Sequence, residues 1–500
     1  MIKPRHLTKL VTYAGVLFLT ILATIILVHV IQTRARLPDL HAWHKVRLAQ
    51  DFRVGRADTP ASFEEYRALE ERLFAEVRRR VLEDPAAADT QTLSRYNSQS
   101  IVTQLALDTP YNRSYELVPA GEPRGAVLLV HGLSDSPYSM RGMAETFLEQ
   151  GYYVLALRLP GHGTLPGELI DVSWEDWYGA VVLAAEHAAS RAGPGNPFLA
   201  GGYSSGAALV TLYSLRALAD TSLKQPEQLY LVSAAIGLSR FAALTRFIAG
   251  LAFIPAFEKS RWIDVIPEYD PYKYNSFPVN AASQIYTLTR VIQQTIGDIE
   301  STGLLQSMPR VHMFQSIVDA TVTSNQVVHG LLGRLPANDH ELFVFDVNRQ
   351  GMLEGLIAPG PLEDLERMRA AADLPFRLTL IGNKADGSRA MAAYTREAGA
   401  ITVDVTELQL EWPRGVFSVG HVSLPFPVDD PVYGLVRAED AEPGYNLGAL
   451  AARGESGALV VDLGAFARPR SNPFFDVIRD AINASLESKE GRSGVGSGSE

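Results

Sequence analysis

The sequence predicts an α/β fold in which a mostly parallel sheet is flanked by helices, with a helical cap insertion and an N-terminal transmembrane helix. After about residue 113, short apolar runs alternate with amphipathic stretches, which is typical of strands joined by crossover helices. Near the start of the chain, 22 residues from Leu10 to Ile31 carry no formally charged side chain. A length of 500 residues leaves room for more than one structural unit.

Composition excludes several classes of protein. The chain has 45 basic and 56 acidic residues, a net charge of −11, and an excess of basic residues is confined to the first 60 positions. An acidic body lacks the basic face that a nucleic-acid partner requires, so we expect no such partner. There is no cysteine, which excludes disulfides, cysteine-ligated zinc and thiol catalysis.

The apolar run from Leu10 to Ile31 predicts a membrane anchor over residues 1–33. At about 1.5 Å per residue the run reaches roughly 33 Å, enough to cross a hydrocarbon core of about 30 Å. A cleaved signal peptide is the alternative, but the run is longer than a usual signal core and no A-x-A-like site precedes Gln32. Basic residues flank both ends almost equally. We favour a single-pass membrane protein with a nine-residue cytoplasmic stub and the body on the exported side.

Residues 34–112 are predicted to be a juxtamembrane helical connector. Ser62 and Glu65 have the spacing of a capping box, and apolar residues recur at helical intervals from there to about Glu83. The remainder of this region is polar and rich in turn-forming residues, as expected of a connecting segment.

Residues 113–487 form the predicted α/β domain, with a cap over about 236–309 and a further insertion over about 347–416. The Gly/Ser-rich residues 488–500 are expected to be a flexible tail. Helices are predicted near Tyr138–Glu149, Trp174–Ser190 and Ser205–Ala219. The predicted strands are Ala126–Val130, Tyr152–Leu157, Pro197–Gly201, Gln228–Val232, Val311–Gln315, Leu342–Phe345 and Arg377–Ile381.

The segment Gly202-Tyr203-Ser204-Ser205-Gly206 carries the strongest chemical signal. It has the G-x-S-x-G pattern and lies where a predicted strand ends and a predicted helix begins. A nucleophilic serine in this setting occupies a sharp turn, and small residues two positions away on either side allow strand and helix to pass closely. We therefore predict a nucleophile at Ser204 rather than a tight turn without chemistry. Ser205 would contribute its backbone N–H to an oxyanion site.

A second segment, Val130-His131-Gly132-Leu133, ends a buried predicted strand. The loop that follows can present a backbone N–H, that of Leu133, to the same oxyanion. His131 is interpreted as a structural residue that braces this loop, because the base in such an arrangement follows the nucleophile in the chain.

Three motifs in order give the sequence a resemblance to a known superfamily: Val130-His131-Gly132-Leu133, Arg158-Leu159-Pro160-Gly161-His162-Gly163-Thr164 and Gly202-Tyr203-Ser204-Ser205-Gly206. With them the chain resembles the α/β-hydrolases, specifically their monoacylglycerol-lipase and carboxylesterase-like branch. The similarity covers residues 114–232 and extends in weaker form to about residue 486. It implies a serine nucleophile at Ser204, oxyanion donors at Leu133 and Ser205, a cap after the strand ending near Val232, and no metal or organic cofactor.

The remaining catalytic partners should follow Ser204 in the order Asp or Glu and then His. Four histidines lie beyond the predicted cap: His312, His329, His340 and His421. The first falls inside a predicted strand, the second in an apolar stretch predicted to be a helix, and the third just before a strand, at its wrong end. His421 follows a glycine on a loop after an apolar run, from which it could reach the serine. We predict His421 as the base.

The acid is predicted as Asp319, which follows the first strand after the cap. His421 then lies 102 residues further on, a longer separation than the family pattern. Asp386, only 35 residues before His421, and Asp346, which also ends a predicted strand, are the alternatives. With Asp319 as the acid, a long insertion falls between acid and base.

These residues predict a serine hydrolase that cleaves carboxylic esters through an acyl-serine intermediate. An amidase or peptidase of the same fold, and a catalytically idle membrane-anchored binding protein, are the alternatives. The expected partners are a small-molecule ester or lipid and, through the N-terminal helix, the membrane; the natural substrate and the oligomeric state stay open. Apolar side chains of the cap that could line an acyl pocket are Phe241, Phe247, Leu251, Phe253, Ile254, Phe257 and Trp262.

Overall fold

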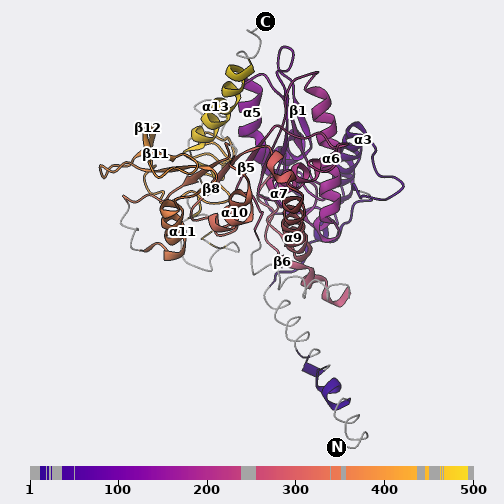
Figure 1. Ribbon diagram of the computed structural model, residues 1–500. Helices are drawn as coiled ribbons and strands as arrows, with labels where there is room; N and C mark the ends of the chain where they lie inside the picture. The colour runs from indigo at the N-terminus through magenta and orange to yellow at the C-terminus, as the bar shows by residue number, and fades with distance from the viewer. Residues whose placement is uncertain are drawn as a thin grey trace, which may run out of the picture.

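The computed structural model describes residues 12–18, 20, 21, 24, 37–49, 51–237, 255–337, 339–350, 356–435, 445–449, 462, 464 and 467–493 (Figure 1). Within them, ten strands form one sheet in the order β1-β3-β2-β4-β5-β8-β9-β10-β11-β12. The strands are β1 (Tyr115–Leu117), β2 (Ala126–Val130), β3 (Tyr153–Leu157), β4 (Phe198–Tyr203), β5 (Gln228–Val232), β8 (Arg310–Ser316), β9 (Glu341–Phe345), β10 (Arg377–Asn383), β11 (Ala390–Arg396) and β12 (Asp404–Glu411). From β3 to β10 all neighbours are parallel, whereas β1, β11 and β12 pair antiparallel. The predicted mostly parallel sheet is confirmed.

All seven predicted strands belong to the parallel part of the sheet, and their ends agree with the prediction to within two residues. The sequence does not predict the three antiparallel strands. β1 has only three residues, β11 is rich in alanine, and β12 is exposed along most of its length. None of the three therefore shows the buried β-branched run that marks a central strand.

Helices cover both faces of the sheet, which explains why its central strands are buried along their whole length (Figure 1). In β2, Ala126, Leu128 and Val130 enter the larger core, while Val127 and Leu129 enter the second core on the opposite face. The larger core includes side chains of α3 (Phe63–Val77), α6 (Trp174–Arg191), α7 (Ser205–Ala217) and α9 (Val279–Thr302). The second includes α5 (Arg141–Glu149) and α13 (Phe475–Ser493).

The segment predicted as a connector packs against the α/β domain. It contains α2 (Ala42–Lys45), α3, a π-helical turn at Arg78–Leu82 and α4 (Ile101–Thr103). Ser62 caps α3 as predicted, because its side chain accepts the Glu65 N–H at 3.2 Å. The apolar face of α3 is buried in the larger core, and its members there are Phe63, Tyr66, Leu69, Leu73 and Val77. This segment therefore shares the core of the domain.

The two predicted insertions differ in how they join the domain. In the cap, α9 packs along α7, and a short two-stranded sheet forms from β6 (Trp262–Asp264) and β7 (Phe277–Pro278). The second insertion contains α11 (Pro359–Ala370) and β10 to β12, which extend the main sheet. The Asn348 N–H donates to the Phe417 carbonyl at 2.8 Å, so this insertion leaves and re-enters the domain at one place.

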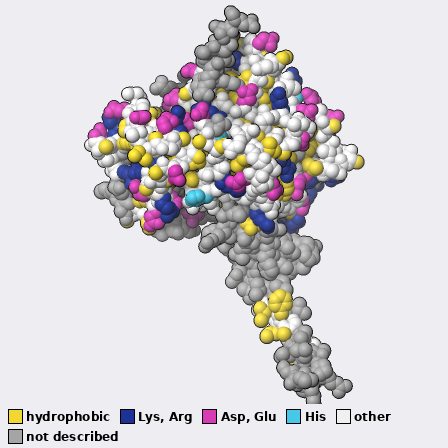
Figure 2. Space-filling model, in the orientation of Figure 1, with side chains coloured by type: hydrophobic (Ala, Val, Ile, Leu, Met, Phe, Trp, Pro, Cys, Tyr) yellow, Lys and Arg dark blue, Asp and Glu magenta, His cyan; other side chains and the backbone are white. Residues whose placement is uncertain are grey.

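The predicted membrane span and tail lie largely beyond the described residues. Of the run 10–31, only 12–18, 20, 21 and 24 are described; they are helical. Their large apolar side chains are exposed, and hydrophobic groups cover this part of the helix in Figure 2. Within the described residues, no helix is both long and apolar enough to cross a membrane. At the other end, α13 continues to Ser493, beyond position 488 where a tail was expected.

Candidate active site

Ser204 occupies a sharp turn between β4 and α7. Its backbone has φ 54° and ψ −112°, a region that non-glycine residues rarely adopt. The turn is held from the neighbouring strand, because the Ser204 N–H donates to the Val232 carbonyl at 2.9 Å and the Ser204 carbonyl accepts the Ala235 N–H at 3.1 Å. A strained serine held in this way has its hydroxyl fixed above the end of the sheet.

The two glycines of the G-x-S-x-G segment are required by close packing at the same turn. A Cβ on Gly202 would lie 2.5 Å from the backbone nitrogen of Ala207. A Cβ on Gly206 would lie 2.0 Å from the carbonyl oxygen of Val130, where β2 ends. No side chain fits at either position, so these glycines allow β2, β4 and α7 to meet at Ser204.

Three of the predicted site residues lie within hydrogen-bond distance of one another. The Ser204 Oγ is 3.0 Å from Nε2 of His421, and Nδ1 of His421 is 2.7 Å from Oδ2 of Asp319. Asp319 is buried and its second oxygen, Oδ1, accepts the N–H groups of Thr321 and Val322 at 2.8 and 2.9 Å. These bonds fix the carboxylate so that Oδ2 points at the imidazole.

The loop that carries His421 is anchored by contacts to two strands of the parallel sheet. From the end of β8, the Ser316 hydroxyl donates to the Val419 carbonyl at 2.6 Å. From the end of β4, the Tyr203 hydroxyl donates to the His421 carbonyl at 3.2 Å. Since β4 also leads to Ser204 and β8 leads to Asp319, the same two strands position all three side chains.

The alternative acids lie elsewhere. Asp386 is exposed on the turn after β10, where it accepts the Ser388 N–H at 2.9 Å. Asp346 is buried at the end of β9 and forms an ion pair with Arg349 at 2.7 Å. Each carboxylate therefore has local partners that hold it away from His421.

The alternative histidines also have other partners. His312 is fully buried in β8, between Glu341 at 2.8 Å and Gln228 at 2.9 Å. His340 is buried and accepts the N–H of Val311 at 3.1 Å, while His329 is exposed on α10 (Ser324–Gly330). None of these three histidines is placed by these contacts beside Ser204 and Asp319.

Both predicted oxyanion donors lie beside the serine. Ser205 is the first residue of α7, so its N–H has no partner within the helix and points out of the helix N-terminus. Its own hydroxyl is buried without a hydrogen-bond partner among the described residues. Leu133 follows β2 and lines the cavity at Ser204. Both residues are thus close to Ser204, where backbone N–H groups can stabilise an oxyanion.

His131 is a bridge between two loops. It is fully buried, and burial holds its pKa well below the ordinary value, so the ring is neutral. Nε2 accepts the Leu159 N–H at 3.0 Å, which leaves Nδ1 as the protonated nitrogen that donates to the Gly132 carbonyl at 2.7 Å. The Gly132 carbonyl and the Leu133 N–H belong to one planar peptide unit, so this bond sets the direction of the N–H.

A cavity of about 280 Å³ opens onto Ser204 and His421. Its lining includes the apolar side chains of Phe277, Ile285, Tyr286 and Val322. It also includes the polar side chains of Asp135, Lys273, Thr289 and Thr321. Lys273 lies 3.4 Å from Asp135. Burial raises the pKa of Asp135, and the charge of Lys273 opposes this shift only in part. The cavity therefore offers contacts to both apolar and polar groups of a ligand.

The sequence does not identify the Asp135–Lys273 pair. Asp135 is two residues beyond Leu133, so its position in the motif is a usable signal, but Lys273 has none. The fold brings it in, because the Tyr274 N–H donates to the Ser134 carbonyl at 2.8 Å. Of the cap residues expected to line a pocket, Trp262 instead packs with Leu37, Ile170 and Val265. The side chains of the others lie outside the described residues.

Comparison with known proteins finds a family model that is similar to the centre of the chain. Residues 121–346 match the family model described as serine aminopeptidase, S33. A thermostable monoacylglycerol lipase from Bacillus sp. (strain H-257) is 37% identical over 76 residues, which are 14% of this chain and 30% of that protein. The chain thus matches less than a third of the length of this curated relative.

Solved structures of lipolytic enzymes are also similar to this chain. One, a metagenome-derived lipolytic enzyme, is 22% identical with a TM-score of 0.37, over 52% of this chain and 99% of that one. Another, the monoacylglycerol lipase of Paleococcus ferrophilus, is 18% identical with a TM-score of 0.35, over 51% of this chain and 96% of that one.

Proposed function

We propose that this chain is a serine hydrolase that cleaves carboxylic esters. It would do so as an α/β-hydrolase of the monoacylglycerol-lipase and esterase-like kind. The observation that carries the proposal is the pair of contacts made by His421, to Ser204 at 3.0 Å and to Asp319 at 2.7 Å. A serine, an imidazole and a buried carboxylate in this order form the arrangement that activates a hydroxyl for attack on an acyl carbon.

In this mechanism His421 takes the proton of Ser204 as the Oγ attacks the ester carbonyl. The N–H groups of Leu133 and Ser205 stabilise the negative charge that develops on the carbonyl oxygen. His421 then protonates the leaving alcohol, which leaves an acyl group on Ser204. Water attacks this acyl-serine with the same imidazole as base, and the acid is released. Asp319 keeps the proton of His421 on Nδ1 and stabilises the imidazolium.

The proposed substrate class is suggested by the mixed apolar and polar lining of the cavity. An acyl chain would lie against Phe277, Ile285 and Val322, and a small polar alcohol group would lie near Lys273 and Asp135. An ester of an apolar acid with a hydroxylated alcohol combines both parts. The curated relative is named a monoacylglycerol lipase, and a substrate of that kind is our proposal for this chain.

Fluorophosphonate labelling tests the nucleophile. Ser204→Ala should abolish both labelling and ester turnover. Ser205→Ala is the matched control and should keep most of the labelling, since only its backbone N–H is used. Full labelling of the Ser204→Ala protein would overturn the assignment.

Two further measurements separate the alternatives. Turnover of an ester and an amide with the same acyl group distinguishes an esterase from an amidase or peptidase. Absence of labelling in the unaltered chain would favour the catalytically idle binding protein.

We further propose that residues 10–31 anchor the protein in a membrane with the body on the exported side. The proposal rests on the uncharged apolar run and on exposed apolar side chains such as Val16, Leu17 and Phe18. Deletion of residues 1–33 should release an active protein from the membrane fraction. If the shortened protein is folded and soluble but inactive, then the remaining residues do not form an active enzyme without the N-terminal segment. Protease access in sealed spheroplasts tests the orientation.

A further inference from the structure

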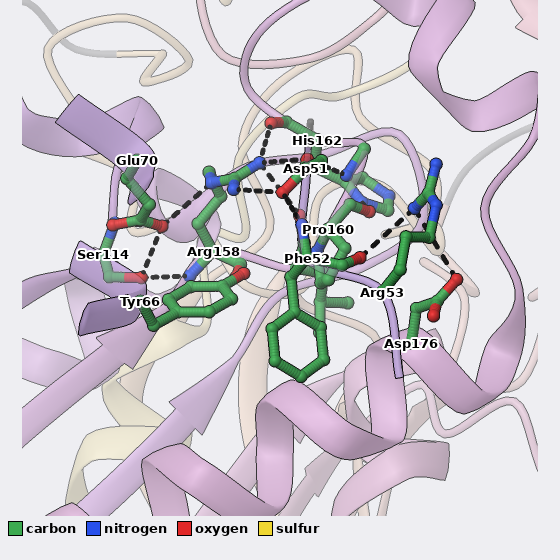
Figure 3. Close-up of polar contacts among 12 residues, drawn as sticks. Asp51, Phe52, Arg53, Tyr66, Glu70, Ser114, Arg158, Pro160, His162 and Asp176 are labelled. Carbon is green, nitrogen blue, oxygen red and sulfur yellow. Dashed lines mark hydrogen bonds and ion pairs between the residues drawn. The ribbon is translucent and has the colours of Figure 1, made fainter. Parts of the chain in front are cut away.

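The segment before the α/β domain contributes two carboxylates to a fully buried ion cluster on Arg158 (Figure 3). Asp51 forms a bidentate pair with the guanidinium at 2.9 and 3.1 Å, and Glu70 accepts Nε at 2.8 Å. Burial acts to raise the pKa of Asp51, but Arg158 holds it below its usual value, so this pair is ionised. Separating the members of a buried ion pair leaves each charge uncompensated and is strongly unfavourable. The carboxylates therefore stay in contact with Arg158.

The same segment holds the loop formed by residues 158–164. Asp51 accepts the Gly161 N–H at 2.7 Å, and the Tyr66 hydroxyl donates to the Arg158 carbonyl at 2.7 Å. Further along the segment, Arg95 donates to the Gly163 carbonyl and Tyr96 to the Thr164 carbonyl, each at 2.9 Å. The loop is therefore bonded to the segment along its whole length.

The loop in turn holds the bridge to the oxyanion site. Its Leu159 N–H donates to His131 Nε2 at 3.0 Å, and the rings of His131 and His162 lie 4.9 Å apart. The other nitrogen of His131 fixes the peptide between Gly132 and Leu133. A continuous series of short contacts thus connects Asp51 with the Leu133 N–H.

We propose that Asp51 and Glu70 are positioning residues for the oxyanion site: through Arg158, the 158–164 loop and His131, they set the direction of the Leu133 N–H. The inference rests on the proposed function, and it makes the segment before the α/β domain a working part of the catalytic unit. Both carboxylates precede residue 121, where the match to the family model begins. This chain therefore supports its oxyanion loop with residues from outside the matched region.

The test uses Asp51→Asn and Glu70→Gln in the full chain. An oxyanion donor acts on the transition state, so each variant should lower kcat by about 10- to 100-fold while KM changes less than about twofold. A trifluoromethyl ketone accepts Ser204 at its carbonyl carbon and carries the resulting oxyanion. Its inhibition constant should rise by the same factor as kcat falls.

Asp176→Asn is the matched control. Asp176 fastens the same segment to α6, by accepting the Val54 N–H at 2.9 Å and facing Arg53 at 3.6 Å, but these contacts do not involve the 158–164 loop (Figure 3). The Asp176→Asn variant should have a lower melting temperature, while its kcat and its inhibition by the ketone stay within twofold of the parent.

If the Asp51→Asn variant does not fold, the Ser114→Ala variant replaces it in the test. Ser114 links Glu70 to the Arg158 N–H at 2.8 and 2.9 Å, and its loss should lower kcat several-fold.

Folded Asp51→Asn or Ser114→Ala protein with unchanged kcat and unchanged ketone inhibition would overturn the inference. So would an equal loss of kcat in the Asp176→Asn control, because the effect would then reflect general destabilisation. A parent chain that turns over no ester and binds no ketone contradicts the proposed function itself, and the inference with it.

Discussion

Asp319 shows how neighbouring groups select one carboxylate for one task. Its Oδ1 accepts two backbone N–H groups, which leaves Oδ2 to face His421 at 2.7 Å. Asp386 has the same chemistry but lies exposed on a turn. The difference between the two residues is therefore one of surroundings, and mutation can measure it.

We expect Asp319→Asn to preserve the fold and to lower kcat/KM by up to about four orders of magnitude, the scale found when a triad aspartate is amidated. The amide favours the wrong imidazole tautomer and cannot stabilise the imidazolium. Asp386→Asn should change the rate little, since an exposed carboxylate contributes only surface electrostatics. The measurement is kcat/KM on one short-chain ester, with circular dichroism as the folding check. A large loss of kcat/KM in Asp386→Asn, together with a nearly unchanged kcat/KM in Asp319→Asn, would reverse the assignment.

The junction of β2, β4 and α7 is where packing between elements creates the site. A Cβ at position 206 would meet two carbonyl oxygens at the end of β2, those of Val130 and His131, at 2.0 and 2.5 Å. Helix α7 cannot move away alone, because the turn at Ser204 joins it directly to β4. Any added atom therefore displaces the end of β2 and the oxyanion loop that follows it.

We expect Gly206→Ala to lower the free energy of unfolding by about 1–3 kcal/mol or more, as overpacking does, and to abolish fluorophosphonate labelling. Gly297→Ala is the control, because Gly297 lies inside α9 with no atom within 4 Å of the added Cβ. That change should stabilise the protein by about 0.5–1 kcal/mol through helix propensity. Urea denaturation and labelling report both effects. Normal labelling of Gly206→Ala would contradict the close packing described for this junction.

Across the whole molecule, buried histidines link stability to pH. Burial lowers the pKa of His162 to about 4, and it lowers the pKa values of His44 and His340 to about 3 and about 4. An unfolded histidine titrates near 6.5, so the unfolded state binds protons first as the pH falls. The stability that each neutral histidine contributes is complete above about pH 6.5 and is lost progressively down to the folded pKa.

Two buried carboxylates act in the opposite direction over part of this range. Burial raises the pKa values of Glu168 and Glu268 to about 7, so their contribution is complete below about pH 4.5 and declines as the pH rises to 7. The pH dependence of the parent chain is therefore a sum of opposing effects. A single-residue comparison is needed to isolate one histidine.

We expect His162→Gln to remove part of the loss of stability between pH 7.5 and pH 5. At pH 5 the protonation linkage of a histidine with a folded pKa near 4 amounts to about 2 kcal/mol. The measurement is the free energy of unfolding in urea at both pH values, for the parent, His162→Gln and the exposed His329→Gln. The His329→Gln protein should behave like the parent. An equal pH dependence in the parent and His162→Gln would contradict the assignment of a buried neutral ring.

Features that neighbouring residues encode could be predicted from the amino-acid sequence. The parallel strands were predicted from short apolar runs, because a strand with helices on both faces is apolar at most of its positions. The turn at Ser204 was predicted from five residues, since the small residues on either side of the serine form a pattern that is visible in the sequence. His421 was favoured because a glycine beside a histidine after an apolar run indicates a loop above the sheet.

The contacts between distant groups could not be predicted in the same way, because they depend on how the whole chain folds. Asp319 and His421 are 102 residues apart, and their contact depends on an insertion that returns to its starting point between Asn348 and Phe417. The segment before the domain showed a helix but gave no sign that Asp51 and Glu70 would surround Arg158 in the core. The physical reason is the same in both cases. Strands, turns and caps follow from interactions within a few residues, whereas these contacts form when the chain closes long loops around a shared core, and no local pattern encodes the partner.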